Sequence, residues 1–147
     1  MTAKQISVFL ENKPGQLTEF TKLLNQNQID MRALSVADAQ DFGILRIIVD
    51  DSYKTACVLK DAGYVFSITP VLAVEIPDQP GSLVQVLEVL AQSGVNLEYT
   101  YAFITRRKDR AYMIFRVADN ERAIDVLTRN GIKLICQDDL SELFEQN

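Results

Sequence analysis

Apolar and polar positions along the first half of the chain change period several times. A short apolar run over residues 5–10 is typical of a strand, and Leu17, Phe20 and Leu24 recur at the spacing of one helix face, with Leu23 beside them. The apolar run over residues 44–49 is nearly continuous, as in a strand buried on both faces. The predicted elements are strands over residues 5–10, 29–37, 44–49 and 64–68, a helix from the turn at 12–15 to about 27, a turn at 41–43, and a second helix with an N-cap in 50–52 and its end at Gly63.

The second half repeats this order. After a turn at residues 77–81, a helix carries a complete apolar stripe, and Val84 and Val89 lie off that stripe. These two extra valines predict a covered second face and a homodimer. The stripe consists of Leu83, Val86, Leu87, Leu90 and Ala91. The other predicted elements are strands over 71–76, 95–104, 111–117 and 133–136, a charged hairpin tip at 106–110, a helix over 120–130, and a tail helix to Phe144 capped by Asp139.

The two halves are copies of one unit. Pro14-Gly15-Gln16-Leu17 returns 66 residues later as Pro80-Gly81-Ser82-Leu83, and Ile29-Asp30 returns as Val95-Asn96. Further matches pair Asp50 with Asp119, Leu59 with Leu127 and Gly63 with Gly131, at offsets of 69, 68 and 68 residues.

The strand–helix–strand–strand–helix–strand order is the ferredoxin-like arrangement, with both helices on one face of an antiparallel sheet. We therefore predict an α+β protein of two such units side by side. Their expected bounds are residues 1–69 and residues 70–147, the latter including the tail helix. A unit of this size would be marginal alone, since small domains bury a smaller fraction of their surface.

Composition and charge narrow the possible functions. The chain has 147 residues, 48% apolar and 24% charged, with a net charge of −5, which argues against nonspecific binding to nucleic acid or anionic membranes. RNA-recognition motifs share the element order, but Tyr112 and Phe115 would point to opposite faces of their strand, so no nucleic-acid partner is expected. No secretory signal or membrane span is recognisable, and we expect a cytoplasmic protein.

Few side chains offer catalytic chemistry. The chain contains no histidine, which removes Ser-His and Cys-His nucleophiles and the commonest metal ligand. Cys57 and Cys136 are expected to be reduced thiols, with Cys57 on an outer helix face. Carboxylates such as Asp30 and Asp78 could do acid–base work, but no nucleophile–base constellation is visible. We therefore expect no enzyme, no metal and no cofactor.

The Pro-Gly turn before each unit's first helix is the feature with ligand-binding potential. Proline suits a helix entry, and glycine lets the backbone approach a ligand closely. The N–H groups of Gly15, Gln16 and Leu17 are expected at a helix N-terminus without intrahelical acceptors, where a carboxylate of a small molecule would be favoured. The alternative is that Pro-Gly only makes a tight turn, which duplication would copy equally well.

These loops resemble those of ACT domains. The resemblance lies in residues 12–17 followed by 28–31, and in residues 78–83 followed by 93–97, and it covers essentially the whole chain as two copies. ACT domains are regulatory modules that bind amino acids, often at the junction of two domains. The resemblance therefore implies a stand-alone, noncatalytic tandem pair whose partner would be an enzyme of amino-acid metabolism.

The resemblance also implies which residues hold a ligand. In the family, one domain contributes its strand–helix loop and the other contributes a polar residue at the start of its second strand. In this chain the resemblance implies one site that combines Asn12 with Asn96 and another that combines Asp78 with Asp30. The Asn pair can both donate and accept, whereas two carboxylates only accept, so we expect the first site to be the better one. Family members can also bind the ligand through a side chain two residues before the polar loop residue. That position is Leu10 in the first unit and Ile76 in the second, so this contact is expected to be absent. The predicted first site is Asn12, Pro14, Gly15, Gln16, Leu17, Asn96, Leu97 and Tyr99, and the weaker second site is Asp78, Pro80, Gly81, Ser82, Leu83, Asp30 and Met31.

Three functions remain open at this point. The leading interpretation is an amino-acid sensor, in which Tyr99, Tyr101 and Phe103 form either an aromatic wall near the ligand or ordinary packing. The second is a protein–protein interaction module without its own ligand, such as a regulatory subunit resembling the acetolactate synthase small subunit. The third is an enzyme. The sequence does not indicate which amino acid binds.

Overall fold

The structure, a computed structural model, describes residues 1–39 and 41–145. The chain divides into two compact units. Residues 4–69 form the first unit, and Pro70 onward together with Met1–Ala3 form the second. The strand β4 (Phe66–Pro77) runs through the change from one unit to the next, where the sequence predicted separate strands over residues 64–68 and 71–76.

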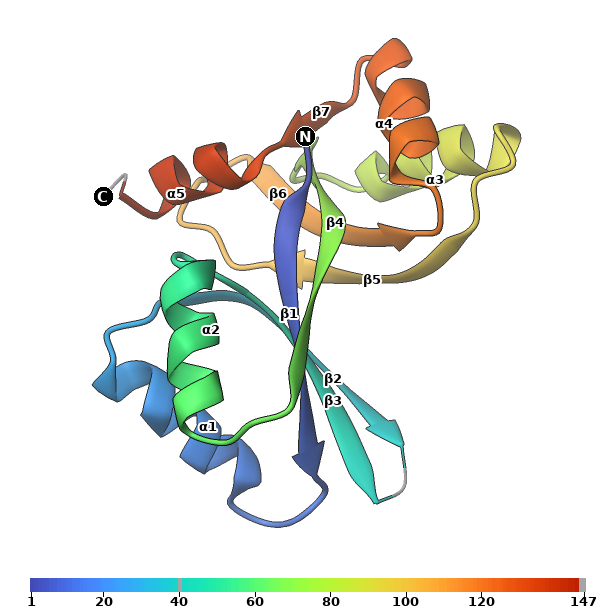
Figure 1. Cartoon of the computed structure of the whole chain (residues 1–147). Helices are drawn as coiled ribbons and strands as arrows, with labels where there is room; N and C mark the ends of the chain where they lie inside the picture. Colours follow the sequence, from blue (N-terminus) through green and yellow to red (C-terminus); the bar gives the residue numbers. More distant parts are fainter. Residues whose placement is uncertain (40, 146–147) are drawn as a thin grey trace. The chain divides into compact units, whose positions relative to one another are not determined.

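The first unit has the predicted order of elements. Its sheet is antiparallel where β3 (Phe42–Val49) pairs with both β1 (Ala3–Glu11) and β2 (Met31–Ala39). Its helices are α1 (Gln16–Gln26) and α2 (Ser52–Asp61). β4 lies beside β1, where the Phe9 N–H donates to the Val65 carbonyl at 3.0 Å. The strand order is therefore β2-β3-β1-β4, and α1 and α2 lie on the same side of these strands (Figure 1).

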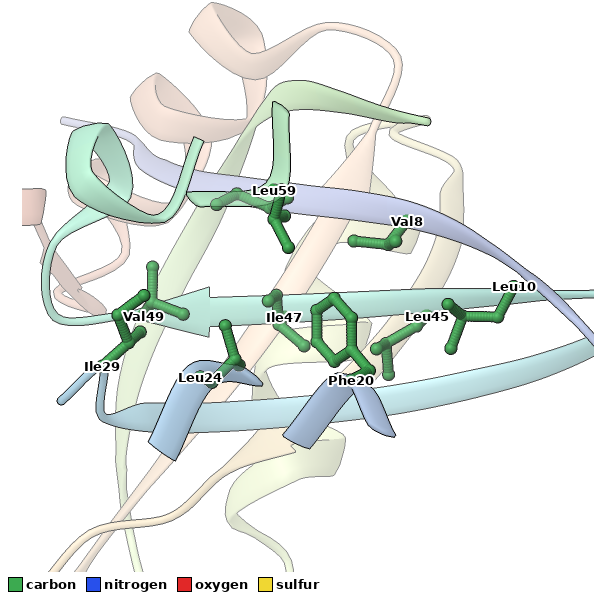
Figure 2. Close-up of a cluster of buried hydrophobic side chains, with 10 residues drawn as sticks. Val8, Leu10, Phe20, Leu24, Ile29, Leu45, Ile47, Val49 and Leu59 are labelled. Atoms are coloured by element: carbon green, nitrogen blue, oxygen red, sulfur yellow. The ribbon is translucent and has the colours of Figure 1, made fainter. Parts of the chain in front are cut away.

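The core of the first unit follows from alternation in the strands. Val8 and Leu10 of β1 point to the same side as Leu45, Ile47 and Val49 of β3, and Figure 2 shows Phe20 and Leu24 of α1 turned toward them. Phe20 also meets the ring of Tyr64 edge-on, with centroids 5.4 Å apart. This buried layer fixes α1, and with it the loop that precedes the helix.

The second unit repeats the arrangement. β6 (Arg110–Val117) pairs antiparallel with β5 (Leu97–Phe103) and β4, and β4 pairs with β7 (Lys133–Ile135), giving the order β5-β6-β4-β7. The helices α3 (Ser82–Gln92) and α4 (Asn120–Arg129) bury Val86, Leu90 and Leu127 against this sheet. The chain is thus an α+β protein with two βαββαβ units, as predicted.

Several details of the sequence prediction are wrong. Asp51 and Asp119 occupy the same N-cap position, so the true match of Asp119 is Asp51 at an offset of 68 residues and not Asp50. Phe42 begins β3 directly where a turn was expected. In α3, Val89 packs against the unit's own core whereas Ala91 is exposed, since the real buried stripe is centred on Val86 and Leu90.

The tail helix α5 (Gln137–Glu145) is present, but its cap differs from the prediction. Asp139 is the third residue of the helix and reaches back to Cys136, accepting hydrogen bonds from its N–H at 3.3 Å and its Sγ at 3.1 Å. These two bonds lower the pKa of Asp139 below its usual value. Among the described residues, no helix is both long and apolar enough to cross a lipid bilayer.

Candidate functional site

The Pro-Gly motif of the first unit forms a type II β-turn. Gly15 has φ 87° and ψ −10°, and the Gln16 N–H donates to the Lys13 carbonyl at 3.3 Å. The second unit repeats the turn, with Gly81 at φ 89° and ψ −11° and the Ser82 N–H donating to the Gln79 carbonyl at 3.3 Å. The glycines are therefore required by the turn itself, whether or not a ligand binds.

The turn changes the expectation for the helix N-terminus. The Gln16 amide, predicted to be available to a ligand, already bonds to Lys13. In the described part of the chain, no side chain caps the first turn of α1 or α3, whereas Asp51 and Asp119 cap α2 and α4. The helix ends that follow the Pro-Gly turns thus differ from the other two in having a glycine N-cap.

A pocket of about 210 Å³ lies beside this loop, within the first unit. Its wall is apolar: Leu10 and Leu45 are buried residues of the sheet, and Leu17 and Val36 expose apolar surface toward solvent. Its rim is polar. The lining residues are Leu10, Glu11, Asn12, Lys13, Gln16, Leu17, Val36, Gly43 and Leu45. Three residues of the predicted first site, Asn12, Gln16 and Leu17, therefore border one pocket, while Pro14 and Gly15 shape the adjacent turn.

Glu11 and Lys13 are rim residues that the sequence reasoning missed. Lys13 Nζ lies 2.6 Å from Glu11 Oε2, and both side chains are exposed. The hydrogen bond that Lys13 donates to Glu11, followed by the negative charge of Glu11, raises the pKa of Lys13 above its usual value. A comparison of the two copies could have pointed to these residues, because the equivalent positions of the second unit are occupied by Pro77 and Gln79 and so lack the ion pair.

The remaining residues of the predicted first site lie in the second unit. Asn96 borders a pocket of about 190 Å³ lined by Gly94, Val95, Asn96, Ala118, Asp119 and Arg122. Leu97 begins β5 and packs partly against the core of that unit. Tyr99 follows a β-bulge and stacks on Tyr101, with centroids 6.5 Å apart and planes at 19°. Asn12 and Asn96 thus each border a pocket formed by their own unit.

The loop of the predicted second site is arranged differently. The Asp78 N–H donates to the Asp109 carbonyl at 3.0 Å, and Leu83 packs partly on the core. Ser82 is buried and, beside the turn of Pro80 and Gly81, borders a pocket of about 390 Å³. The charged residues on that pocket are Glu75, Arg110 and Lys133.

The carboxylate of Asp30 has a partner that the sequence reasoning did not consider. Arg32 Nη1 lies 3.6 Å from Asp30 Oδ2, and the Asp30 N–H donates to Asp50 Oδ1 at 3.0 Å. The adjacent Met31 packs against the core of the first unit. The expectation that two bare carboxylates would meet at the second site therefore overstated the negative charge at Asp30.

A nearly buried ion cluster distinguishes the second unit from the first. The side chain of Glu75 is only 8% exposed. Its Oε1 lies 3.8 Å from Arg110 Nε, and its Oε2 lies 3.7 Å from Lys133 Nζ. The Tyr112 hydroxyl donates to Glu75 Oε2 at 2.9 Å. Burial first, and then the hydrogen bond to Glu75, raise the pKa of Tyr112.

The corresponding positions of the first unit carry apolar side chains. Strand register, with offsets of 66, 68 and 68 residues, matches Glu75 with Phe9, Arg110 with Phe42 and Lys133 with Val65. The three apolar residues are exposed. Together these three border another pocket of the first unit. The two copies therefore share a backbone but present different chemistry at equivalent places.

Comparisons with known proteins agree with this fold. A family model described as an ACT domain pair matches residues 1–144. The crystal structure of protein BT0572 from Bacteroides thetaiotaomicron is similar at a TM-score of 0.90 and 40% identity, covering 97% of this chain and 98% of that one.

Two more distant structures share the fold alone. The ligand-free regulatory subunit of aspartate kinase from Thermus thermophilus has a TM-score of 0.62 at 16% identity, covering 86% of this chain and 90% of that one. The same subunit from Thermus flavus has a TM-score of 0.56 at 15% identity, with coverage of 86% and 90%. No curated protein sequence matches the chain.

Proposed function

Because this chain belongs to the family of ACT domain pairs, we propose that it is a noncatalytic regulatory protein that binds a free amino acid. Ligand binding would change the affinity of the protein for an enzyme of amino-acid metabolism. Coupling of this kind is typically worth about 1–3 kcal/mol. The regulatory subunits of aspartate kinase, which share the fold, support a place in amino-acid metabolism.

The observation that carries this proposal is the pocket beside the β1–α1 loop. It combines an apolar wall with polar groups of both hydrogen-bonding types, from Asn12 and Gln16, and with charges of both signs, from Glu11 and Lys13. Small-molecule sites commonly consist of a mostly apolar wall with a few placed polar groups. An amino acid has matching parts, since its head group carries both charges and its side chain can be apolar.

The resemblance to ACT domains extends the proposal to residues of the second unit. It implies a grip from two sides, so we include Asn96, Leu97 and Tyr99 in the first site, and Asp78 with Asp30 in a weaker second one. Asn96→Ala should then weaken amino-acid binding more than Asp30→Ala does. A hydrogen bond to a charged group is worth about 1.5–3 kcal/mol, so calorimetric titration would resolve the difference. Equal losses in the two variants would contradict the ranking of the sites.

A thermal-shift screen against the twenty amino acids, with calorimetry on the hits, tests the function as a whole. Selective stabilisation by one or two amino acids, without turnover of the ligand, is the expected result. If none stabilises the protein at millimolar concentration, the proposed ligand-binding function is wrong.

An interaction module without its own ligand is the second candidate. The exposed apolar residues Phe9, Phe42 and Val65 of the first unit favour it, because clustered apolar surface commonly marks a contact with another protein. We also propose a homodimer, on the grounds that Val84 is exposed on α3. Sedimentation velocity over a range of protein concentrations would test the homodimer, and a monomer at all concentrations would refute it.

A further inference from the structure

We propose that the first unit's pocket selects an amino acid with an uncharged aliphatic side chain, and that the Glu11–Lys13 ion pair recognises its zwitterionic head. The inference rests on the proposed function, since it assumes that an amino acid occupies this pocket. It adds a ligand class and two residues that the sequence analysis did not include in the site.

The apolar wall decides the class of side chain. Leu10 and Leu45 are buried residues of the sheet, Val36 of β2 is 55% exposed, and α1 contributes Leu17. An aliphatic side chain placed here would remove its own apolar surface and that of the exposed lining residues from water, which is favourable. A hydroxyl or charged side chain at the same wall would lose hydration without gaining a partner from these four residues.

The size of the pocket agrees with such a ligand. Its volume of about 210 Å³ is somewhat larger than the roughly 150 Å³ apolar cavity that takes up benzene. It is smaller than the roughly 300–1,000 Å³ typical of sites for drug-sized molecules. The pocket can therefore hold one small aliphatic side chain, with the head group at its polar rim.

The ion pair at the rim matches the head group. Lys13 and Glu11 are 2.6 Å apart, so they present a positive and a negative group side by side at one end of the pocket. A zwitterion adds no net charge, and its carboxylate can contact Lys13 while its ammonium contacts Glu11. The amides of Asn12 and Gln16 can donate to the first group or accept from the second. A ligand with only one of the two charges would contact only one member of the pair and would lose the second charge contact.

The second copy provides an internal comparison. The positions of Glu11, Asn12 and Lys13 are occupied there by Pro77, Asp78 and Gln79, which lack the positive member of the pair and leave a single negative charge. The proline also has no N–H to donate. Zwitterion recognition by this device is therefore specific to the first unit.

Ligand pairs that differ in one group test the inference by calorimetry on the full chain. Valine against threonine compares a methyl with a hydroxyl at nearly constant shape, and we expect at least roughly tenfold weaker binding of threonine. Leucine is also compared with two analogues. Leucinamide lacks the carboxylate charge but keeps the ammonium, and 4-methylpentanoate lacks the ammonium but keeps the carboxylate. Each loss should weaken binding about ten- to hundredfold, the ratio expected for one hydrogen bond to a charged group.

Three variants locate the effect. Lys13→Gln, which copies the second unit's residue, should weaken valine and leucine binding about ten- to hundredfold while retaining the preference for valine over threonine. Val36→Ser should reduce that preference. Ile104→Ser is the matched control, because this branched aliphatic residue after β5 is 63% exposed and lies outside the pocket lining. It should leave both affinities unchanged.

The outcomes separate this inference from the proposed function. Tight binding of a polar or charged amino acid would overturn the aliphatic selectivity and leave the amino-acid function standing. Aliphatic binding that is insensitive to Lys13→Gln and Val36→Ser would overturn the assignment to this pocket. Binding of no amino acid at all would overturn both.

Discussion

Single residues in the Pro-Gly turns have a conformational role that is separable from ligand binding. Gly15 and Gly81 have φ near 90°, a region that costs a residue with a Cβ about 1–2 kcal/mol. The Glu11–Lys13 pair and the Asn12 side chain can vary around the turn without altering this requirement.

Replacing Gly15 by alanine should therefore destabilise the protein by about 1–2 kcal/mol, because a Cβ there meets no atom within 4 Å and the cost is that of the backbone alone. Urea unfolding measures the change. Gly43→Ala is the control: its φ lies outside the left-handed region, and an added Cβ would be 3.8 Å from its nearest neighbour, so stability should hardly change. Equal effects of the two substitutions would contradict the strain argument.

Tyr112 provides a second prediction at this scale. Tyr112→Phe removes the hydrogen bond to the nearly buried Glu75 and should cost about 1–3 kcal/mol. Since the folded pKa of Tyr112 is raised above 10.0, its contribution is fully present below pH 10 and is lost as the pH rises through the folded value. Unfolding at neutral and alkaline pH should show the wild type and the variant converging. Tyr53→Phe, at an 81% exposed tyrosine, should show neither effect.

Local conformation at these residues was predictable and side-chain pairing was not. Pro14-Gly15 dictates a turn through the φ angles that proline and glycine prefer, and both copies of the turn form as expected. The pairing of Arg32 with Asp30, by contrast, arises at a β-bulge after Met31. The equivalent bulge after Leu97 holds Glu98 instead, so the sequence carries no common signal for it.

Among the elements, α2 and α4 have aspartate caps that α1 and α3 lack. Asp51 accepts from the Lys54 N–H at 2.9 Å and Asp119 from the Arg122 N–H at 3.1 Å. Asp51→Ala and Asp119→Ala should each cost about 0.5–2 kcal/mol in thermal or urea unfolding.

Asp61 is the control for these caps. It lies at the last turn of α2, where a carboxylate opposes the helix dipole, so Asp61→Ala should be neutral or slightly stabilising. A loss of stability equal to that of Asp51→Ala would show that the effect is not one of capping.

Element order followed from the sequence because apolar periodicity and turn residues agree in both copies. Element ends did not. β4 continues through Thr69 and Pro70, whereas the sequence predicted separate strands over residues 64–68 and 71–76, because proline is uncommon in the interior of a strand. The cap of α5 was misassigned because Asp139 acts from inside the helix on Cys136.

For the whole molecule, ligand binding and folding are linked. At a free ligand concentration of 100 times its dissociation constant, stability should rise by about 2.7 kcal/mol. A chain of this length gains about 2–4 °C per kcal/mol, so the melting temperature should increase by roughly 5–10 °C. Differential scanning fluorimetry with and without the identified amino acid measures this shift. The Lys13→Gln variant at the same ligand concentration should show a smaller shift, and an undiminished one would exclude a role for Lys13.

At this scale the duplication made the fold predictable but concealed the differences between the copies. The repeated Pro-Gly motif identified two equivalent loops, and the sequence reasoning treated their ligand chemistry as a matter of Asn against Asp. The 66-residue offset already matches Phe9 with Glu75, but their grouping with Phe42 and with Arg110, respectively, became visible only with strand register.

The residues that form the Pro-Gly turn are different from those at the rim of the pocket, and this bears on how the two copies could diverge after duplication. The turn and its surroundings use backbone groups of the three residues before Pro14, such as the Lys13 carbonyl that accepts from the Gln16 N–H, so the side chains at these positions can differ between the copies. The two copies can then carry different specificities within a single polypeptide. The same freedom makes residues 77–79 a recipient site for the tripeptide Glu-Asn-Lys, by which a second recognition site could be engineered into an unchanged scaffold.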